Sequence, residues 1–212
     1  MKDENEAVTS AKGKLPMLTK DEFLEPLARL RGDSVVVTCM GVTRPWGRRS
    51  HVELDFASAD SAMGHTADLA LGIALARPER KVICLNGDGS MLMTLGTLVT
   101  ATQAAARNYY LFIIQNDTYE ITGNLPIPGA GKVDFGVLAR GAGFTSIYEF
   151  DHAASYTASL PAVLGGEGPV LVVAKVEPGT EGPISRSAKE ASLYLKESLA
   201  EWARRMRRAL NS

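Results

Sequence analysis

Two stretches decide the fold of this 212-residue chain: VICLNGDGS over residues 82–90 and LFIIQND over residues 111–117. Each starts as a short apolar run and ends in polar residues, a pattern typical of a strand that is buried on both faces. The segment between them, from about Ser90 to Ala106, predicts a helix. A strand, a helix and a second strand in that order form a parallel pair, so the polar ends of both strands should meet at one edge of the sheet.

The same alternation extends outward in both directions. We expect strands at 34–40, 82–85, 110–115, 144–150 and 170–176, helices at 64–76, 90–106, 134–141 and 153–164, and a further helix between a capping box at Thr19 and Gly32. The Gly-, Pro- and Arg-containing segment 41–50 is expected to be a loop. This order predicts an α/β fold with a doubly wound, mainly parallel sheet flanked by helices.

Chain length and periodicity suggest one domain. We expect a loose tail over residues 1–17, the main domain over 18–180, and a C-terminal amphipathic helix within 181–212, either part of the same domain or of a subunit contact. One stripe of this last segment is apolar and comprises Leu195, Leu199, Trp202, Met206 and Leu210.

Composition excludes several classes of function. The net charge of −1 leaves no cationic surface of the kind that nucleic acid requires. Cys39 and Cys84, the two cysteines of the chain, lie in apolar runs and are expected to be buried thiols, not ligands of a metal or cluster. No apolar run is long enough to span a membrane, and the polar start Met1–Ala7 is unlike a secretory signal. We therefore expect a cytoplasmic protein without nucleic-acid or membrane partners.

The residues at the first strand end suggest a specific chemistry. Asp88 lies between Gly87 and Gly89, which let the backbone approach a ligand, and a helix begins directly afterwards. The N-terminus of that helix would attract a phosphate, whereas the Asp88 carboxylate would repel it unless a hard cation lies between them. Asn116, separated from Gly89 by residues 90–115, offers a second oxygen ligand at the neighbouring strand end. The pair therefore predicts Mg²⁺ together with a diphosphate.

With this spacing, the chain resembles the thiamine diphosphate enzymes, which carry Gly-Asp-Gly followed some 24 to 27 residues later by an Asn pair. The resemblance implies that Asp88, Asn116 and the Thr118 backbone carbonyl bind Mg²⁺. Gln115 departs from it by replacing the first Asn. The resemblance covers roughly residues 34–176 and is greatest to the small subunits of phosphonopyruvate and sulfopyruvate decarboxylases. Leu125 departs from that group, in which a Gln is expected.

The resemblance extends to the segment Ser61-Ala62-Met63-Gly64, where the family has a turn before a helix. It implies that the Ser61 carbonyl holds the 4'-amino group of the cofactor and that the Met63 side chain props its two rings into a bent conformation. The full set of expected cofactor-binding residues is Ser61, Ala62, Met63, Gly64, Gly87, Asp88, Gly89, Ser90, Asn116, Thr118, Tyr119, Glu120 and Thr122.

Several residues have two interpretations. His65 is either an acid or base near the reacting carbon or a helix-start histidine satisfied by its neighbours. Thr122 and Asn124 either contact the diphosphate or substrate or are ordinary loop residues. Glu120, where the family usually has Gly, could pair with cofactor or partner, although a solvent-facing carboxylate is the ordinary expectation. Arg44, Arg48 and Arg49 with His51 either bind a substrate anion or form a solvated face or subunit contact.

The resemblance also implies an activity and a partner. Members of the family decarboxylate a small 2-oxo acid and need a glutamate from a separate pyrimidine-binding domain, for which this chain is too short by about 150 residues. We therefore expect a pyrimidine-binding alpha subunit in a hetero-oligomer, either a dimer of heterodimers or a larger assembly. The alternatives are a split acetolactate-synthase-like carboligase and a cofactor-binding subunit without turnover.

Overall fold

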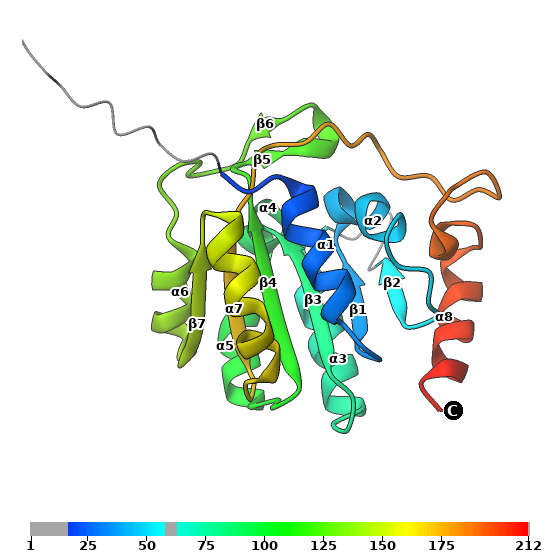
Figure 1. The fold of residues 1–212 in the computed structure, drawn as a ribbon, viewed down its shortest axis with the longest axis horizontal. Helices are drawn as coiled ribbons and strands as arrows, with labels where there is room; N and C mark the ends of the chain where they lie inside the picture. The colour runs from blue at the N-terminus through cyan, green and yellow to red at the C-terminus, as the bar shows by residue number, and fades with distance from the viewer. Residues whose placement is uncertain (1–16, 58–62, 212) are drawn as a thin grey trace, which may run out of the picture.

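A six-stranded parallel sheet forms the centre of the computed structural model, which describes residues 17–57 and 63–211 (Figure 1). The strand order is β2-β1-β3-β4-β8-β7. The strands are β1 (Val35–Thr38), β2 (Asp55–Ala57), β3 (Val82–Gly87), β4 (Tyr109–Gln115), β7 (Ser146–Phe150) and β8 (Val170–Lys175), and a separate two-residue hairpin pairs β5 (Thr118–Tyr119) with β6 (Leu125–Pro126). The predicted doubly wound, mainly parallel sheet is confirmed.

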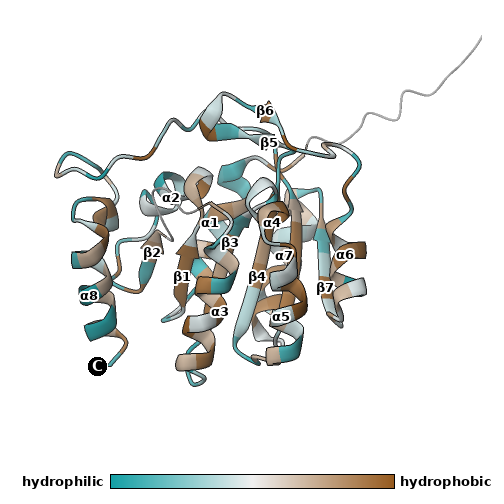
Figure 2. Cartoon of the chain, turned by 180° about the vertical axis from the view of Figure 1, so that it is seen from behind, coloured by the Kyte–Doolittle hydropathy of each residue, from teal (hydrophilic) through white to brown (hydrophobic). Residues whose placement is uncertain are grey.

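Helices cover both faces of the sheet. The helices are α1 (Lys20–Leu30), α2 (Met40–Gly47), α3 (Thr66–Ala76), α4 (Asp88–Met93), α5 (Gly96–Ala104), α6 (Phe135–Ala142), α7 (Ala153–Gly165) and α8 (Leu199–Ala209), with short 3-10 turns η1 (Glu120–Thr122) and η2 (Leu193–Leu195). α1, α2 and α7 pack together on the face toward the viewer in Figure 1, whereas α3, α5 and α6 cover the opposite face, seen in Figure 2. None of the helices in the described residues is long and apolar enough to cross a membrane.

Local sequence explains most of these elements. The Thr19 side chain and the Glu22 carboxylate cap the first turn of α1 reciprocally, as the sequence predicts. Strands β3 and β4 are buried on both faces because helices cover them, and this explains their continuous apolar runs. Cys84 is fully buried in β3, in agreement with its prediction as a structural thiol.

Three predicted boundaries are wrong. Residues 40–47 form α2 instead of a loop because Val42 and Trp46 are buried against the sheet, and this packing outweighs the poor helix propensity of Gly and Pro. The helix predicted over 90–106 is broken between α4 and α5, where Thr94 leaves helical geometry and its hydroxyl donates to the Gly64 carbonyl oxygen (2.5 Å). The C-terminal stripe is α-helical only over Leu199–Ala209, whereas Leu195 lies in the separate 3-10 turn η2.

The C-terminal segment packs on the edge of the sheet. Trp202 of α8 is fully buried, and its Nε1–H donates to the backbone oxygen of Asp55 in edge strand β2 (2.6 Å). The Asp55 carboxylate is itself buried and forms an ion pair with Arg31, which follows α1. The edge strand is therefore covered, which protects its unpaired backbone groups from another chain.

Candidate functional site

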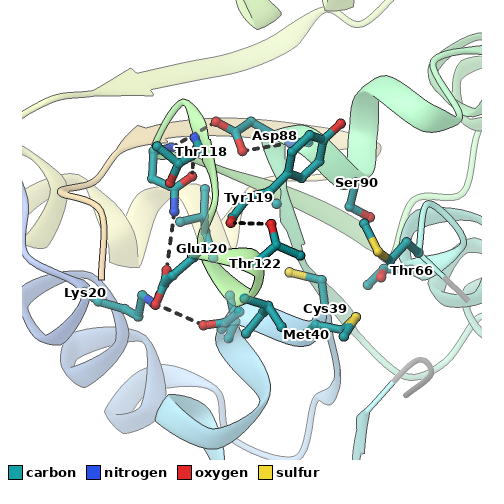
Figure 3. Close-up of a pocket in the computed structure, with 18 residues that line it drawn as sticks. Lys20, Cys39, Met40, Thr66, Asp88, Ser90, Thr118, Tyr119, Glu120 and Thr122 are labelled. Atoms are coloured by element: carbon teal, nitrogen blue, oxygen red, sulfur yellow. Dashed lines mark hydrogen bonds and ion pairs between the residues drawn. The ribbon is translucent and has the colours of Figure 1, made fainter. Parts of the chain in front are cut away.

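A pocket opens at the carboxyl ends of β1, β3 and β4 (Figure 3). The chain proceeds from β1 to β2 in one direction along the sheet and from β3 to β4 in the other, so the strand order reverses between β1 and β3. Such a reversal leaves a crevice where ligands bind in open α/β sheets. The pocket has a volume of about 780 Å³ with its open mouth included and is lined by Lys20, Cys39, Met40, Gly41, Val42, Met63, Thr66, Gly87, Asp88, Gly89, Ser90, Ile114, Asn116, Thr118, Tyr119, Glu120, Ile121 and Thr122.

Asp88 joins the two strand ends. Its Oδ2 accepts hydrogen bonds from the backbone N–H groups of Asn116 (3.0 Å) and Asp117 (2.6 Å), and its Oδ1 accepts one from Gly89 N–H (2.7 Å). The residue is only 2% exposed, and this burial raises the pKa of Asp88 to about 6 although the three hydrogen bonds act in the opposite direction. The predicted proximity of Asp88 and Asn116 is therefore present in the structure.

Asn116 and Thr118 lie on the loop that follows β4. The Asn116 Oδ1 atom accepts a hydrogen bond from Thr118 N–H (3.1 Å), and the Thr118 hydroxyl donates to Asn124 Oδ1 (2.8 Å). Asp117, between them, has a positive φ of 60°, which turns the loop sharply over Asp88. The three residues assigned to the metal by resemblance, Asp88, Asn116 and Thr118, thus line one pocket, and Asn124 holds the Thr118 side chain.

The start of α4 is packed tightly against this loop. A Cβ atom on Gly89 would lie 2.4 Å from Tyr119 Cε1, so no larger residue fits without displacing Tyr119. Ser90 Oγ accepts a hydrogen bond from Gly64 N–H (3.2 Å), which ties α4 to the turn before α3. Met63 of this turn lines the pocket, whereas Ser61 and Ala62 lie outside the described residues.

The interpretation of Glu120 as a solvent-facing carboxylate is wrong. Glu120 is buried and forms an ion pair with Lys20, the first residue of α1 (Figure 3). The sequence gives no local signal for this contact, because the two residues are 100 positions apart.

His65 does not line the pocket. Its side chain is 63% exposed and its Nδ1 atom lies 2.8 Å from Asp68 Oδ2, which matches the interpretation as a helix-start histidine satisfied by a neighbour. The Thr122 hydroxyl donates to the Tyr119 carbonyl oxygen (3.0 Å), as an ordinary loop residue would, although Thr122 also lines the pocket.

The three arginines of α2 and its C-terminus are engaged within the chain. Arg44 pairs with Glu190, Arg48 with Glu181, and Arg49 with Asp21. None of the three lines the pocket. Their contacts fasten the segment before α8, and the start of α1, to α2.

Several residues that line the pocket at the end of β1 were not predicted from the sequence. Cys39, Met40 and Gly41 lie at a strand end beside the reversal point, so the rule that locates Asp88 also identifies them once α2 is recognised. Burial raises the pKa of the Cys39 thiol to about 11, so this residue stays protonated and contributes as an apolar wall.

The family model described as "Thiamine pyrophosphate enzyme, C-terminal TPP binding domain" matches residues 37–174, more than half of the chain. The chain belongs to this family. A thiamine diphosphate-dependent enzyme from Mycobacterium smegmatis shares the fold, with a TM-score of 0.66 at 24% identity over 78% of this chain and 34% of that one.

Three curated relatives of this thiamine pyrophosphate domain differ in how much of their length it spans. Sulfopyruvate decarboxylase subunit beta of Methanothermobacter thermautotrophicus is 36% identical over 56% of this chain and 60% of its own length. The subunit beta of Methanococcus maripaludis is 30% identical over 77% of this chain and 87% of its own length. Phosphonopyruvate decarboxylase of Streptomyces hygroscopicus is 32% identical over 59% of this chain, but the match spans only 31% of that protein.

Proposed function

We propose that this chain is the thiamine diphosphate- and Mg²⁺-binding subunit of a two-component 2-oxo acid decarboxylase similar to the sulfopyruvate and phosphonopyruvate enzymes. One observation carries the proposal: the buried Asp88 carboxylate accepts hydrogen bonds from the Asn116 loop at the reversal point of the sheet. Asp88, Asn116 and Thr118 line the same pocket, and we assign their carboxylate, amide oxygen and backbone carbonyl to the metal.

The oxygen donors fit Mg²⁺. A carboxylate offers about four lone-pair directions, of which three on Asp88 accept backbone N–H groups, so one remains for a cation. Asn116 Oδ1 accepts one hydrogen bond and retains its second lone pair. Hard oxygen ligands of this kind, few in number and supplemented by substrate phosphates, are those that Mg²⁺ uses in proteins.

The pocket walls fit the organic part of the cofactor. Gly87 and Gly89 line the pocket beside Asp88, while Met40, Val42 and Ile121 supply apolar surface. Bound thiamine diphosphate supplies the electron sink for loss of CO₂ from a 2-oxo acid. The residues of this chain anchor and orient the cofactor, and Met63 is assigned to hold its rings in the reactive conformation.

Two observations support a separate pyrimidine-binding alpha subunit. This chain matches most of the length of one relative named subunit beta, but only 31% of the phosphonopyruvate decarboxylase. In addition, large apolar side chains are exposed on α3, on α5 and on the segments beside them, and a partner would cover these side chains. These residues are Met63, Leu69, Leu75, Met93, Leu95 and Val99. Met63 belongs to both this surface and the pocket, so a subunit bound here would border the cofactor.

Activity should require both components. We expect the purified chain, supplied with thiamine diphosphate and Mg²⁺, to release no CO₂ from 2-oxo acids until a pyrimidine-domain subunit is added. Product analysis of the mixture separates decarboxylation, which gives an aldehyde, from carboligation, which gives a larger hydroxy-oxo acid. Rapid CO₂ release by the chain alone would contradict the two-component proposal.

Cofactor binding should weaken in acid. Mg²⁺ binds the carboxylate form of Asp88, whose pKa is about 6 because of burial, so the site is competent above pH 6 and is lost as the pH falls through that value. The apparent affinity should fall about tenfold between pH 7 and pH 5, as the ionised fraction of one group with that pKa does. Calorimetric titrations across this range test the expectation.

The cofactor needs its own control in these titrations, because a terminal phosphate also titrates near pH 6. The Mg²⁺ affinity of free thiamine diphosphate, measured at each pH, removes this contribution. A corrected affinity that does not change between pH 7 and pH 5 would exclude titration of Asp88.

A further inference from the structure

A buried ion pair between Lys20 and Glu120 lines the pocket beside the proposed metal ligands. Lys20 Nζ lies 2.7 Å from Glu120 Oε1 and 2.6 Å from Oε2, and the two side chains are 12% and 4% exposed. Removing two charges from water has a desolvation cost that their mutual attraction often does not offset, so a buried ion pair is weak evidence for stability by itself. The groups that this pair contacts indicate a different role.

Glu120 bonds directly to the side chain of Asn116. Asn116 Nδ2 donates to Glu120 Oε2 (3.3 Å), while Asn116 Oδ1, the other end of the same amide, accepts from Thr118 N–H (3.1 Å). An ionised carboxylate can only accept hydrogen bonds, so it binds the NH₂ end of the amide and excludes the flipped orientation. The oxygen end is thereby left for a cation.

Lys20 and the C-terminal segment hold Glu120 in that position. Lys20 Nζ also donates to the Gly41 carbonyl oxygen (3.1 Å), and Glu181 N–H donates to Glu120 Oε1 (2.9 Å). Gly179 packs so closely that a Cβ atom there would lie 2.5 Å from Glu120 Oε1 and 2.8 Å from Lys20 Nζ. Elements from the start, middle and end of the chain therefore fix one carboxylate.

We propose that Glu120, held by Lys20, is a positioning residue that orients the Asn116 amide so that its oxygen faces the metal. This inference rests on the proposed function, because it assigns Asn116 Oδ1 to Mg²⁺. It gives Glu120 a purpose that the family resemblance does not, since the family usually has Gly at this position. In this role Glu120 contacts neither metal nor substrate.

Two double variants isolate the acceptor from the ion pair. Lys20→Met with Glu120→Leu removes both charges and the acceptor, whereas Lys20→Met with Glu120→Gln removes both charges but keeps a carbonyl oxygen within reach of Asn116. Each variant loses one positive and one negative charge, so the net charge near the metal is unchanged. The readout is the dissociation constant of Mg²⁺, measured by calorimetry at saturating thiamine diphosphate. The sample is this chain together with its partner subunit once that subunit is identified.

We expect the Leu variant to bind Mg²⁺ roughly 10- to 100-fold more weakly than the wild type, which is the range typical for loss of a residue that hydrogen-bonds to a metal ligand. The Gln variant should bind Mg²⁺ more tightly than the Leu variant. Arg44→Met with Glu190→Gln is the matched control, because it removes a half-buried ion pair between α2 and the same C-terminal segment without touching the pocket. Its Mg²⁺ affinity should equal that of the wild type.

The possible outcomes separate this inference from the proposed function. If the wild type shows no Mg²⁺-dependent cofactor binding, the proposed function fails and this inference fails with it. If the wild type binds but the Leu and Gln variants bind equally well, or equally poorly, only the positioning role is overturned, since the acceptor then makes no difference. Should the Leu variant not fold by circular dichroism, Lys20→Met with Glu120→Ser replaces it, because serine is polar but too short to reach Asn116.

Discussion

Replacement of Asp88 by alanine is expected to abolish Mg²⁺-dependent binding of thiamine diphosphate. The substitution removes the one carboxylate among the proposed metal ligands and also the acceptor that draws the Asn116 and Asp117 backbone toward β3. The loss should exceed the roughly 100-fold upper range for residues that only support a ligand. Calorimetric titration of the cofactor with and without Mg²⁺ measures it.

Asp117→Asn is the matched control for this variant. It removes a neighbouring negative charge but keeps the backbone N–H that donates to Asp88, and asparagine tolerates the positive φ of this position. The control should retain Mg²⁺-dependent binding, and circular dichroism should show both variants folded. An Asp88→Ala chain that binds with wild-type affinity would remove Asp88 from the metal site.

The position of Asp88 and Asn116 could be predicted from the sequence because it depends on topology. Two neighbouring buried strands that are joined by a helical crossover run parallel, so their carboxyl ends lie at the same edge of the sheet. This holds whether the crossover is one helix or two. The break between α4 and α5 did not affect this prediction. The binding motif and the alternation of strands and helices each required only local patterns, and local patterns are what a single sequence contains.

The contacts of Glu120 and the helix α2 could not be predicted in the same way. Glu120 meets Lys20 across 100 positions of sequence, and Trp46 of α2 is buried and donates a hydrogen bond to Asp55. Both depend on which segments become neighbours after folding, and the residues around Trp46, with their glycines, proline and arginines, have the local character of a loop. The predicted solvent-facing Glu120 failed because the usual exposure of carboxylates says nothing about a distant lysine.

Outside the pocket, substitution of Arg31 is expected to have a large effect on stability. Arg31→Met should lower the free energy of unfolding by about 3–5 kcal/mol, because it leaves the fully buried Asp55 carboxylate without its counter-charge. Arg31 also donates to Ser50 Oγ (2.7 Å) and to the Ser34 carbonyl oxygen, so it joins the end of α1 to β1 and β2. Denaturant titration monitored by circular dichroism gives the change.

Two comparisons show whether the unpaired charge causes the loss. Arg29→Met removes a solvent-exposed pair with Glu25 and should change stability by less than about 0.5 kcal/mol. Arg31→Met combined with Asp55→Asn removes the charge but keeps an oxygen for Trp46 Nε1–H, which donates to Asp55 Oδ1 (3.0 Å). Because a neutral amide costs less to bury than an unpaired carboxylate, the double variant should be more stable than Arg31→Met alone. Equal instability of the two would instead assign the loss to the hydrogen bonds that Arg31 makes to Ser34 and Ser50.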